Sequence, residues 1–223
     1  MSAPAIPIHR VPIASGDTPS RRPRGRPHKT ADERDDGNRR QQLLNTAARL
    51  FRRRGFDATS TRDIAAAVGM HSGSPFYHFK SKDALLFAVM QEGMQAAMNR
   101  QTTALQEMAA GQPLEQIRLL IRTHFDTLLG PGNDFVPVML YEHRSLSSSQ
   151  RASLAKLQVA YESVWTPVLQ ALHASGHLRA PVKLARLLIL GALNWSVQWF
   201  DHKKSATLDE LTEATMALIL REC

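Results

Sequence analysis

The residues best suited to reading a nucleic acid lie between positions 59 and 79. Thr59 or Ser60 can cap a short helix there, with Asp63 in capping-box spacing to Ser60 and Gly69 as the end of the helix. A tight turn and a second short helix follow. Two short helices joined by a turn with glycine are typical of a helix-turn-helix, whose second helix enters the major groove of DNA. Because short helices joined by glycine are common, the pattern alone does not decide.

A second candidate for DNA contact is the segment 21–27, with the sequence Arg-Arg-Pro-Arg-Gly-Arg-Pro. Its Pro-Arg-Gly-Arg-Pro core is similar to an AT-hook. Proline holds the backbone extended and glycine lets it approach the groove floor. Arg24 and Arg26 would then insert into the narrow, electronegative minor groove of A·T-rich DNA. The alternative is a merely basic, solvated tail.

A third feature is the segment 184–200, which is apolar on nearly all sides of a helix and must be covered on two faces. One face can pack on its own domain and the other on a partner subunit, with a helix over 207–221 completing a four-helix interface by symmetry. The alternative is a central core helix in a monomer. Arg186, Asn194 and Gln198 interrupt the segment, which argues against a membrane span.

Candidate ligand contacts fall on the predicted C-terminal helices. They are Arg122, His124, Arg144, Trp165, Trp195 and Trp199. His124 lies on the apolar face of the predicted helix 113–129, where a histidine is either a core residue or a ligand contact. The arginines, with Arg151, could hold an anionic group or simply lie on the surface. The tryptophans could line an apolar cavity or pack in the core.

Helical periodicity accounts for the rest of the chain, and no convincing strand alternation occurs. A first helix starts at Asn38 and ends at three arginines, 52–54, followed by Gly55. Glycine and proline mark the later breaks. Further helices are predicted near 81–109, with Ser81 as cap, and near 113–129, 135–143, 147–175, 181–202 and 207–221. The fold class is therefore all-α.

The charge distribution points in the same direction as the motifs. The 223 residues carry a net charge of +8. Residues 1–90 hold 16 Lys+Arg and 8 Asp+Glu, whereas residues 91–223 hold 12 of each. A basic N-terminal part on a neutral C-terminal part suggests a polyanion-binding head on a body with another task. A basic solubility tail is the alternative.

The residues that catalysis or metal binding would need are not grouped in this sequence. No nucleophile–base–acid set and no phosphate-cradling glycine loop stands out, so no catalytic residues and no enzyme are expected. The histidines are scattered, so neither a metal site nor a cofactor is expected. The single cysteine, Cys223, excludes an intramolecular disulfide and favours a reducing cytoplasm.

The two helix-turn-helix segments carry a family resemblance. Residues 59–69 are Thr-Ser-Thr-Arg-Asp-Ile-Ala-Ala-Ala-Val-Gly, and residues 73–82 are Gly-Ser-Pro-Phe-Tyr-His-Phe-Lys-Ser-Lys. In order, spacing and residue type they resemble the signature of the TetR/AcrR family of one-component transcriptional regulators, over about residues 40–88. The C-terminal part resembles the family in length and helical layout. The resemblance implies a homodimeric DNA-binding repressor with an effector pocket in the C-terminal domain.

The resemblance also implies site residues. Ser72, Gly73 and Ser74 fall where the family's recognition helix meets base edges. Tyr77 and His78 fall where it touches bases and phosphates, and Lys82 falls where the family contacts phosphate. With the AT-hook, the residues expected to contact DNA are Arg24, Arg26, Ser60, Arg62, His71, Ser72, Gly73, Ser74, Tyr77, His78 and Lys82.

Two residues depart from the family pattern. Pro75 stands where the family has an aliphatic residue, which a helix tolerates if Ser72 is its cap, because the proline then lies in the first turn. Phe76 replaces a tyrosine, so it lacks the hydroxyl for a phosphate. Tyr77 could take over that contact, and Phe76 could instead pack between helices, as Phe79 is expected to do.

Residues 141–147 and 190–195 are similar to the branch of the family that controls steroid and fatty-acid catabolism and senses CoA thioesters. This favours an acyl-CoA or another lipid-like effector in a mostly apolar pocket, with an anionic head held by an arginine. The expected domains are a disordered basic tail (1–37), a three-helix DNA-binding domain (38–88) and a helical effector-binding and dimerisation domain (89–223).

The predicted function is a ligand-responsive transcriptional regulator, most simply a repressor that an apolar effector releases from a double-stranded DNA operator. Its homodimer would form through helices near 181–202 and 207–221, without a membrane partner. The alternatives are an architectural protein of A·T-rich DNA and an all-α enzyme that uses the C-terminal cavity. The sequence does not distinguish repression from activation.

Overall fold

The computed structural model describes residues 31–70, 75–108, 111–130, 132–201, 203 and 206–221. All regular secondary structure within these ranges is helical, which confirms the all-α prediction. The elements are α1 (Ala31–Arg54), α2 (Thr61–Ala67), α3 (Pro75–His78), α4 (Lys82–Gln106), α5 (Pro113–Leu129), α6 (Phe135–Glu142), the 3-10 helix η1 (His143–Ser145), α7 (Ser148–Ser163), α8 (Trp165–Ala174), α9 (Val182–Trp195), the 3-10 helix η2 (Ser196–Gln198) and α10 (Leu208–Ile219).

The short helices of the N-terminal part begin and end where the local sequence predicts. Ser60 caps α2: its hydroxyl accepts the Asp63 N–H at 3.1 Å, and the Asp63 carboxylate accepts the Ser60 N–H at 2.8 Å. At α4 the Ser81 hydroxyl accepts the Ala84 N–H at 3.0 Å, without a reciprocal side-chain bond. Gly55 and Gly69 follow α1 and α2 with φ of +81° and +70°, a conformation that favours glycine and ends each helix.

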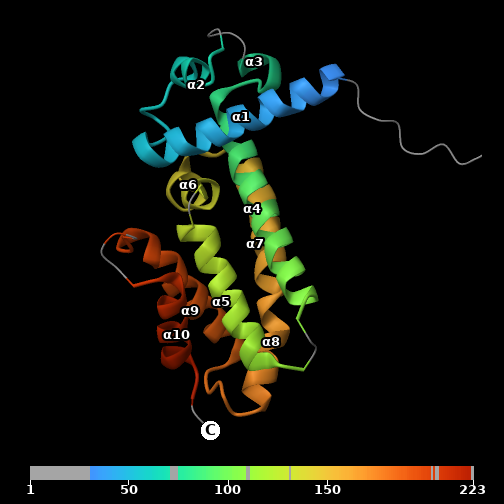
Figure 1. The fold of residues 1–223 in the computed structure, drawn as a ribbon, viewed down its shortest axis with the longest axis vertical. Helices are drawn as coiled ribbons and strands as arrows, with labels where there is room; N and C mark the ends of the chain where they lie inside the picture. The colour runs from blue at the N-terminus through green and yellow to red at the C-terminus, as the bar shows by residue number, and fades with distance from the viewer. Residues whose placement is uncertain are drawn as a thin grey trace, which may run out of the picture.

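Helix α4 joins the two parts of the molecule. Figure 1 shows α1, α2 and α3 together at one end, which we call the head, and α4 running from the head into the remaining helices, which we call the body. In the head α4 packs against α1, and in the body it packs against α5, α6 and α7. A displacement of α4 in the body must therefore also displace the helices that α4 contacts in the head.

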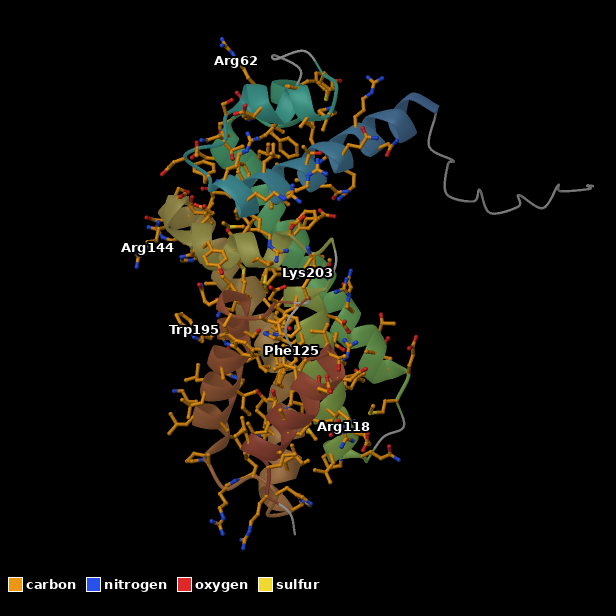
Figure 2. The ribbon with its side chains drawn as sticks, turned by 60° about the vertical axis from the view of Figure 1, so that its left-hand side comes forward. Arg62, Arg118, Phe125, Arg144, Trp195 and Lys203 are labelled. Carbon is orange, nitrogen blue, oxygen red and sulfur yellow. The ribbon has the colours of Figure 1, made fainter. Side chains whose placement is uncertain are left out.

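The hydrophobic core of the head does not end with α4. Phe51, Ile64 and Leu86 belong to a buried cluster that also contains three residues of the body. These are Val138 of α6, Leu146, and Leu154 of α7. The body has its own larger cluster around Phe125 and Trp165 (Figure 2). The head core thus includes α6, although the predicted domain boundary lay at 88/89.

Three helices differ clearly from the sequence prediction. The helix predicted near 181–202 is shorter, because α9 ends at Trp195 and the 3-10 helix η2 follows it. Helix α1 begins at Ala31 rather than Asn38, and residues 31–36 are rich in acidic residues, which favour a helix N-terminus. The helix predicted over 147–175 is divided into α7 and α8 at Val164. Pro167 explains the break, since it lacks an N–H and its ring would clash with the Ser163 carbonyl.

None of the helices in the described ranges combines the length and apolarity that a membrane span needs. Within the same ranges, no three His, Cys, Asp or Glu side chains gather as a metal-binding group.

The closest approach of α4 to α6 gives a test of this packing. A Cβ on Gly93 would lie 2.5 Å from Phe135 Cβ, whereas a Cβ on Gly37 of α1 would meet nothing within 4 Å. Overpacking of this kind costs about 1–3 kcal/mol, against about 1 kcal/mol gained when alanine replaces glycine in a helix. We expect Gly93→Ala to lower the free energy of unfolding in urea titrations and Gly37→Ala to raise it. Equal stability of the two variants would contradict the packing of α4 on α6.

Candidate functional site

The head presents exposed polar and aromatic side chains at the end away from the body. Arg62 of α2 is exposed and points away from the rest of the molecule (Figure 2). Tyr77 of α3 is 80% exposed, and its ring meets the His78 ring edge-on at a centroid distance of 5.3 Å. Since α2 and α3 contact one another, these side chains share one end of the molecule. An exposed tyrosine and arginine there suit contacts to DNA bases and phosphates.

Several predicted contacts lie outside the described residues. They are Arg24, Arg26, His71, Ser72, Gly73 and Ser74. The AT-hook and the tip of the recognition helix therefore stay predictions. Pro75 is the first residue of α3, a position where its missing N–H leaves no intrahelical bond unmade.

Ser60 and Lys82 both have roles in the fold besides the predicted DNA contacts, and only the role of Ser60 as a helix cap was expected from the sequence. The Ser60 hydroxyl is used in the α2 cap. The Lys82 ammonium donates to the carbonyl oxygens of Phe56 at 2.9 Å and Thr59 at 3.1 Å, and lies 4.1 Å from the centre of the Phe56 ring. Two of its three N–H groups are thereby used, so the phosphate contact predicted for Lys82 stays a prediction that depends on the third.

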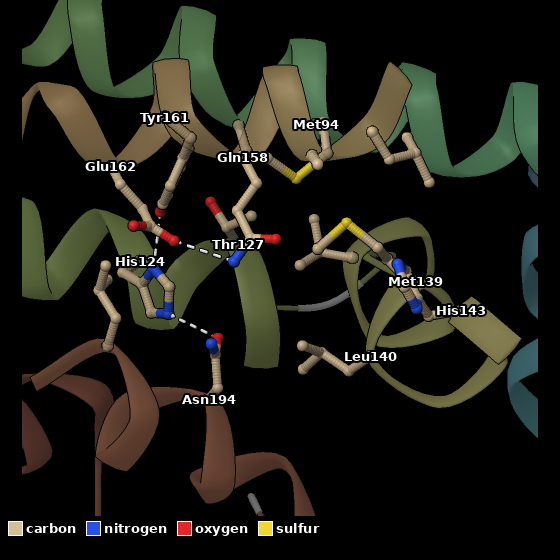
Figure 3. A pocket seen from close by; sticks show the side chains of 15 residues that line it. Met94, His124, Thr127, Met139, Leu140, His143, Gln158, Tyr161, Glu162 and Asn194 are labelled. Atoms are coloured by element: carbon tan, nitrogen blue, oxygen red, sulfur yellow. Dashed lines mark hydrogen bonds between the residues drawn. The ribbon is translucent and has the colours of Figure 1, made fainter. Parts of the chain in front are cut away.

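The body encloses a cavity of about 310 Å³ between α4, α5, α6, α7 and α9 (Figure 3). Apolar side chains form most of its wall, among them Met94, Val136, Met139, Leu140, Leu154 and Leu190. Polar side chains complete it: His124, Thr127, His143, Gln158, Tyr161, Glu162 and Asn194. His143 and Gln158 are exposed, and they mark the side on which the cavity opens. A mostly apolar cavity with a few polar groups is typical of a small-molecule site.

A buried hydrogen-bonded chain forms the inner polar end of the cavity. His124 Nδ1 lies 2.6 Å from the Tyr161 hydroxyl, and His124 Nε2 lies 3.1 Å from Asn194 Oδ1 (Figure 3). Burial lowers the pKa of His124 to about 4, with the hydrogen bond to Asn194 opposing the shift. Burial also raises the pKa of the Tyr161 hydroxyl. Both side chains are therefore neutral at physiological pH.

Glu162 is the carboxylate of the cavity wall. Its Oε1 accepts a hydrogen bond from Gln158 Nε2 at 2.9 Å, and its Oε2 lies 3.6 Å from Nε of Arg186 on α9. Arg186 also donates to Thr166. The charge of Glu162 is thus balanced from behind the wall.

Of the six predicted ligand contacts, only His124 lines the cavity. Arg122 is paired with Asp126 and with Asp209 of α10, so it joins two helices instead of meeting a ligand. Arg144 is exposed and points outward (Figure 2). Neither arginine is among the residues that line this cavity, so an anionic head held by either one would lie outside it, and a role for them in ligand binding stays a prediction.

The three tryptophans also differ from the prediction. Trp165 is fully buried and packs edge-on against His124, with centroids 5.9 Å apart, so it supports the cavity from behind. Trp195 and Trp199 are 65% and 54% exposed. Trp195 points away from the body (Figure 2) and lies outside the cavity.

Sequence analysis missed most of the residues that do line the cavity. Met94, Met139, Tyr161 and Asn194 come from four different helices. One signal was available: Asn194 is a polar residue in an otherwise apolar helix, but it was used only to argue against a membrane span and as part of the resemblance over 190–195.

Helix α6 is bonded to the head at both of its ends. Before its first residue, Asp134 accepts a 3.0 Å hydrogen bond from Nη1 of Arg52 at the end of α1. At its last residue, Glu142 accepts the backbone N–H of Phe56 at 2.9 Å. Met139, between them, lines the cavity and packs against both hydrophobic clusters. One short helix therefore contacts the cavity and the head at once.

Comparisons with known proteins agree with this arrangement. Residues 43–89 match the family of bacterial regulatory proteins, tetR family, and residues 110–223 match the tetracyclin repressor-like C-terminal domain. The HTH-type transcriptional repressor KstR2 of Rhodococcus jostii (strain RHA1) is 26% identical over 193 residues, which cover 85% of this chain and 93% of KstR2.

Solved structures show the same fold. AibR in complex with isovaleryl coenzyme A and operator DNA superposes with a TM-score of 0.74 at 26% identity, covering 81% of this chain and 97% of AibR. A crystal structure described as superantigen pfit has a TM-score of 0.69 at 39% identity, covering 82% of this chain and 89% of that one.

The buried histidine predicts a pH dependence of stability. His124 has a usual pKa of 6.5 and a folded pKa of about 4. Between these values the unfolded chain binds a proton that the folded chain does not, so stability is full above pH 6.5 and is lost as the pH falls toward 4. We expect the free energy of unfolding to fall by up to about 1.4 kcal/mol per pH unit more in the wild type than in His124→Gln. Urea titrations across this window measure the difference, and parallel curves would contradict it.

Proposed function

This chain belongs to the TetR family of bacterial regulatory proteins, and from that premise we propose that it is a DNA-binding transcriptional repressor that a small, largely apolar effector releases from its operator. The observation that carries the proposal is the wall shared by the cavity and the head. Leu154 and Met139 line the cavity, while Leu154 belongs to the head core and Met139 packs against it. A ligand in the cavity therefore touches side chains on which the DNA-binding head is packed.

The relatives support the same class of function. KstR2 is named a transcriptional repressor, and AibR was solved with both operator DNA and isovaleryl coenzyme A. A cavity of about 310 Å³ lies at the lower end of the range for ligand sites, roughly 300–1,000 Å³. We propose that it takes the apolar part of an acyl-CoA or of another lipid-like metabolite, with any large polar part outside the opening near His143.

We propose that the head contacts DNA through Arg62, Tyr77 and His78, together with the recognition turn at 71–74. The phosphates attract the arginine, and the turn enters the major groove. The AT-hook arginines, Arg24 and Arg26, would add contacts in an adjacent minor groove.

The second copy in the homodimer covers the outer face of α9. Leu184, Leu187, Leu188 and Trp195 are each at least half exposed and form a stripe along this helix. A Cβ on Gly191, in the same stripe, would meet nothing within 4 Å, so a partner helix can approach closely there. An exposed apolar stripe of this length is typical of a subunit interface.

We propose that the chain has no enzymatic activity and acts in the cytoplasm, where its operator is. Its named relatives are transcriptional regulators. An architectural role on A·T-rich DNA is not favoured, because such a role needs no cavity connected to the head.

Binding to the DNA upstream of the chain's own gene tests the proposal. In a mobility-shift titration, we expect discrete complexes that resist non-specific competitor DNA and dissociate when acyl-CoA thioesters are added. The physical reason is that a ligand that prefers one arrangement of α4 and α6 shifts the head away from its DNA-binding position. A smear on every sequence, unaffected by thioesters, would instead indicate an architectural protein.

The bond from α6 to the head gives a second test. Glu142→Ala leaves the half-buried N–H of Phe56 without its acceptor, which costs about 1–3 kcal/mol, whereas Glu142→Gln keeps an acceptor at the same place. We expect the alanine variant to bind operator DNA several-fold more weakly in fluorescence anisotropy and to unfold at a lower temperature. The glutamine variant serves as the matched control. If both variants bind as the wild type does, α6 does not position the head.

A further inference from the structure

Among the described residues at the inner end of the cavity, Asn194 has a hydrogen-bond donor for which no described acceptor is present. An amide oxygen can only accept, so the contact between Asn194 Oδ1 and His124 Nε2 places the hydrogen on Nε2. His124 Nδ1 is then the acceptor of the Tyr161 O–H. In this structure the Asn194 amide thus has its oxygen toward His124. Its nitrogen, Nδ2, donates to no atom of the described chain, although the side chain lines the cavity.

The other inner polar groups already have partners. The Thr127 hydroxyl accepts from Arg100 at 3.2 Å and donates to the Thr123 carbonyl at 2.8 Å. Gln158, at the opening of the cavity, donates to Glu162. An acceptor atom that enters the inner end of the cavity therefore meets the N–H groups of Asn194 first.

The charged residues at the cavity determine whether a charged or an uncharged acceptor group of a ligand can bind next to Asn194. No lysine or arginine is among the residues that line it, and Glu162 supplies a carboxylate whose side chain is 15% exposed. A carboxylate on the ligand would be buried there with no cation among the lining residues, which is costly. An uncharged carbonyl oxygen accepts the same hydrogen bond without that cost.

We propose that Asn194 recognises the effector by donating a hydrogen bond from Nδ2 to an uncharged carbonyl oxygen, as in a thioester, ester, amide or ketone. The apolar group next to that carbonyl fills the space along Met94, Val136 and Leu190. This assignment rests on the proposed function, because it takes the cavity to be the effector site, and it makes the specificity of that site depend on Asn194.

Four small probes of similar length separate the possible ligand groups. They are methyl hexanoate, S-methyl thiohexanoate, the hexanoate anion and methyl hexyl ether. Titration calorimetry on the purified full chain measures their affinities. We expect both carbonyl compounds to bind about tenfold more tightly than the ether, since one buried neutral hydrogen bond has about that effect. We expect the anion to bind the most weakly, and the ester–thioester comparison shows which carbonyl class is preferred.

Two variants test the residue itself. Asn194→Asp keeps an acceptor for His124 but loses the donor, and Asn194→Leu loses both at similar volume. We expect each to reduce the preference for ester over ether to about onefold. Asn99→Asp makes the same chemical change on the exposed side of α4, where Asn99 pairs with Gln95, and should keep the wild-type preference. The preference is the ratio of ester affinity to ether affinity, both measured on the same variant. A general loss of stability lowers both affinities and therefore does not change this ratio.

Three outcomes would overturn the assignment: tighter binding of the anion than of the ester, equal binding of ester and ether by the wild type, or an unchanged preference in both Asn194 variants. Operator binding, measured on the same samples, separates a failure of the role of Asn194 from a failure of the proposed function. If the protein binds its operator and thioesters release it while the carbonyl preference is absent, the proposed function stands and the role of Asn194 fails. If the probes bind as expected but the operator is not bound, the proposed function fails instead.

Discussion

The main chain of Phe56 is held by α4 and α6 together, and the position of the DNA-binding head depends on this. Its N–H donates to Glu142 of α6, and its carbonyl accepts from Lys82 at the start of α4. Phe56 lies in the loop that leads from α1 into α2, the first helix of the helix-turn-helix. Buried main-chain groups need partners, so this loop cannot leave either helix without losing a hydrogen bond. The head is thus fixed to the two helices that also form walls of the cavity.

The sequence predicted the features that local chemistry determines. The capping box of Ser60 and Asp63, the glycines that end α1 and α2, and the Ser81 cap are interactions between residues close in the chain, and the structure confirms them. The break at Val164 was open to prediction from Pro167, but the helical periodicity on both sides concealed it. That α6 packs in the head core through Val138 could not be predicted, because it depends on contacts distant in sequence.

The cavity shows the same limit more strongly. His124 could be connected with the cavity from its place on the apolar face of α5, but its hydrogen-bond partners are 37 and 70 residues away. Arg122, two residues before it, faces Asp209 of α10, and nothing local distinguishes an arginine that pairs between helices from one that meets a ligand. Asn194 lies between the cavity and the outer face of α9, because the next residue, Trp195, belongs to the exposed apolar stripe of that helix. The residue that we assign to ligand recognition therefore also borders the proposed subunit interface.

A ligand changes DNA binding only through different affinities for two arrangements of the protein. A side chain of α4, Met94, and one of α6, Met139, both line the cavity, so its occupant sets the separation of these helices. Both α4 and α6 are hydrogen-bonded to the main chain of Phe56. A change in the distance between these helices therefore either rotates the head or breaks one of these hydrogen bonds, each worth about 1 kcal/mol. Moving the head from 99:1 to 1:99 takes about 5.5 kcal/mol. Apolar contact must supply most of this, on the order of 220 Å² of additional buried surface at about 25 cal/mol per Å². In a homodimer two ligands share the requirement, so each needs about half that area, which a short acyl group can provide.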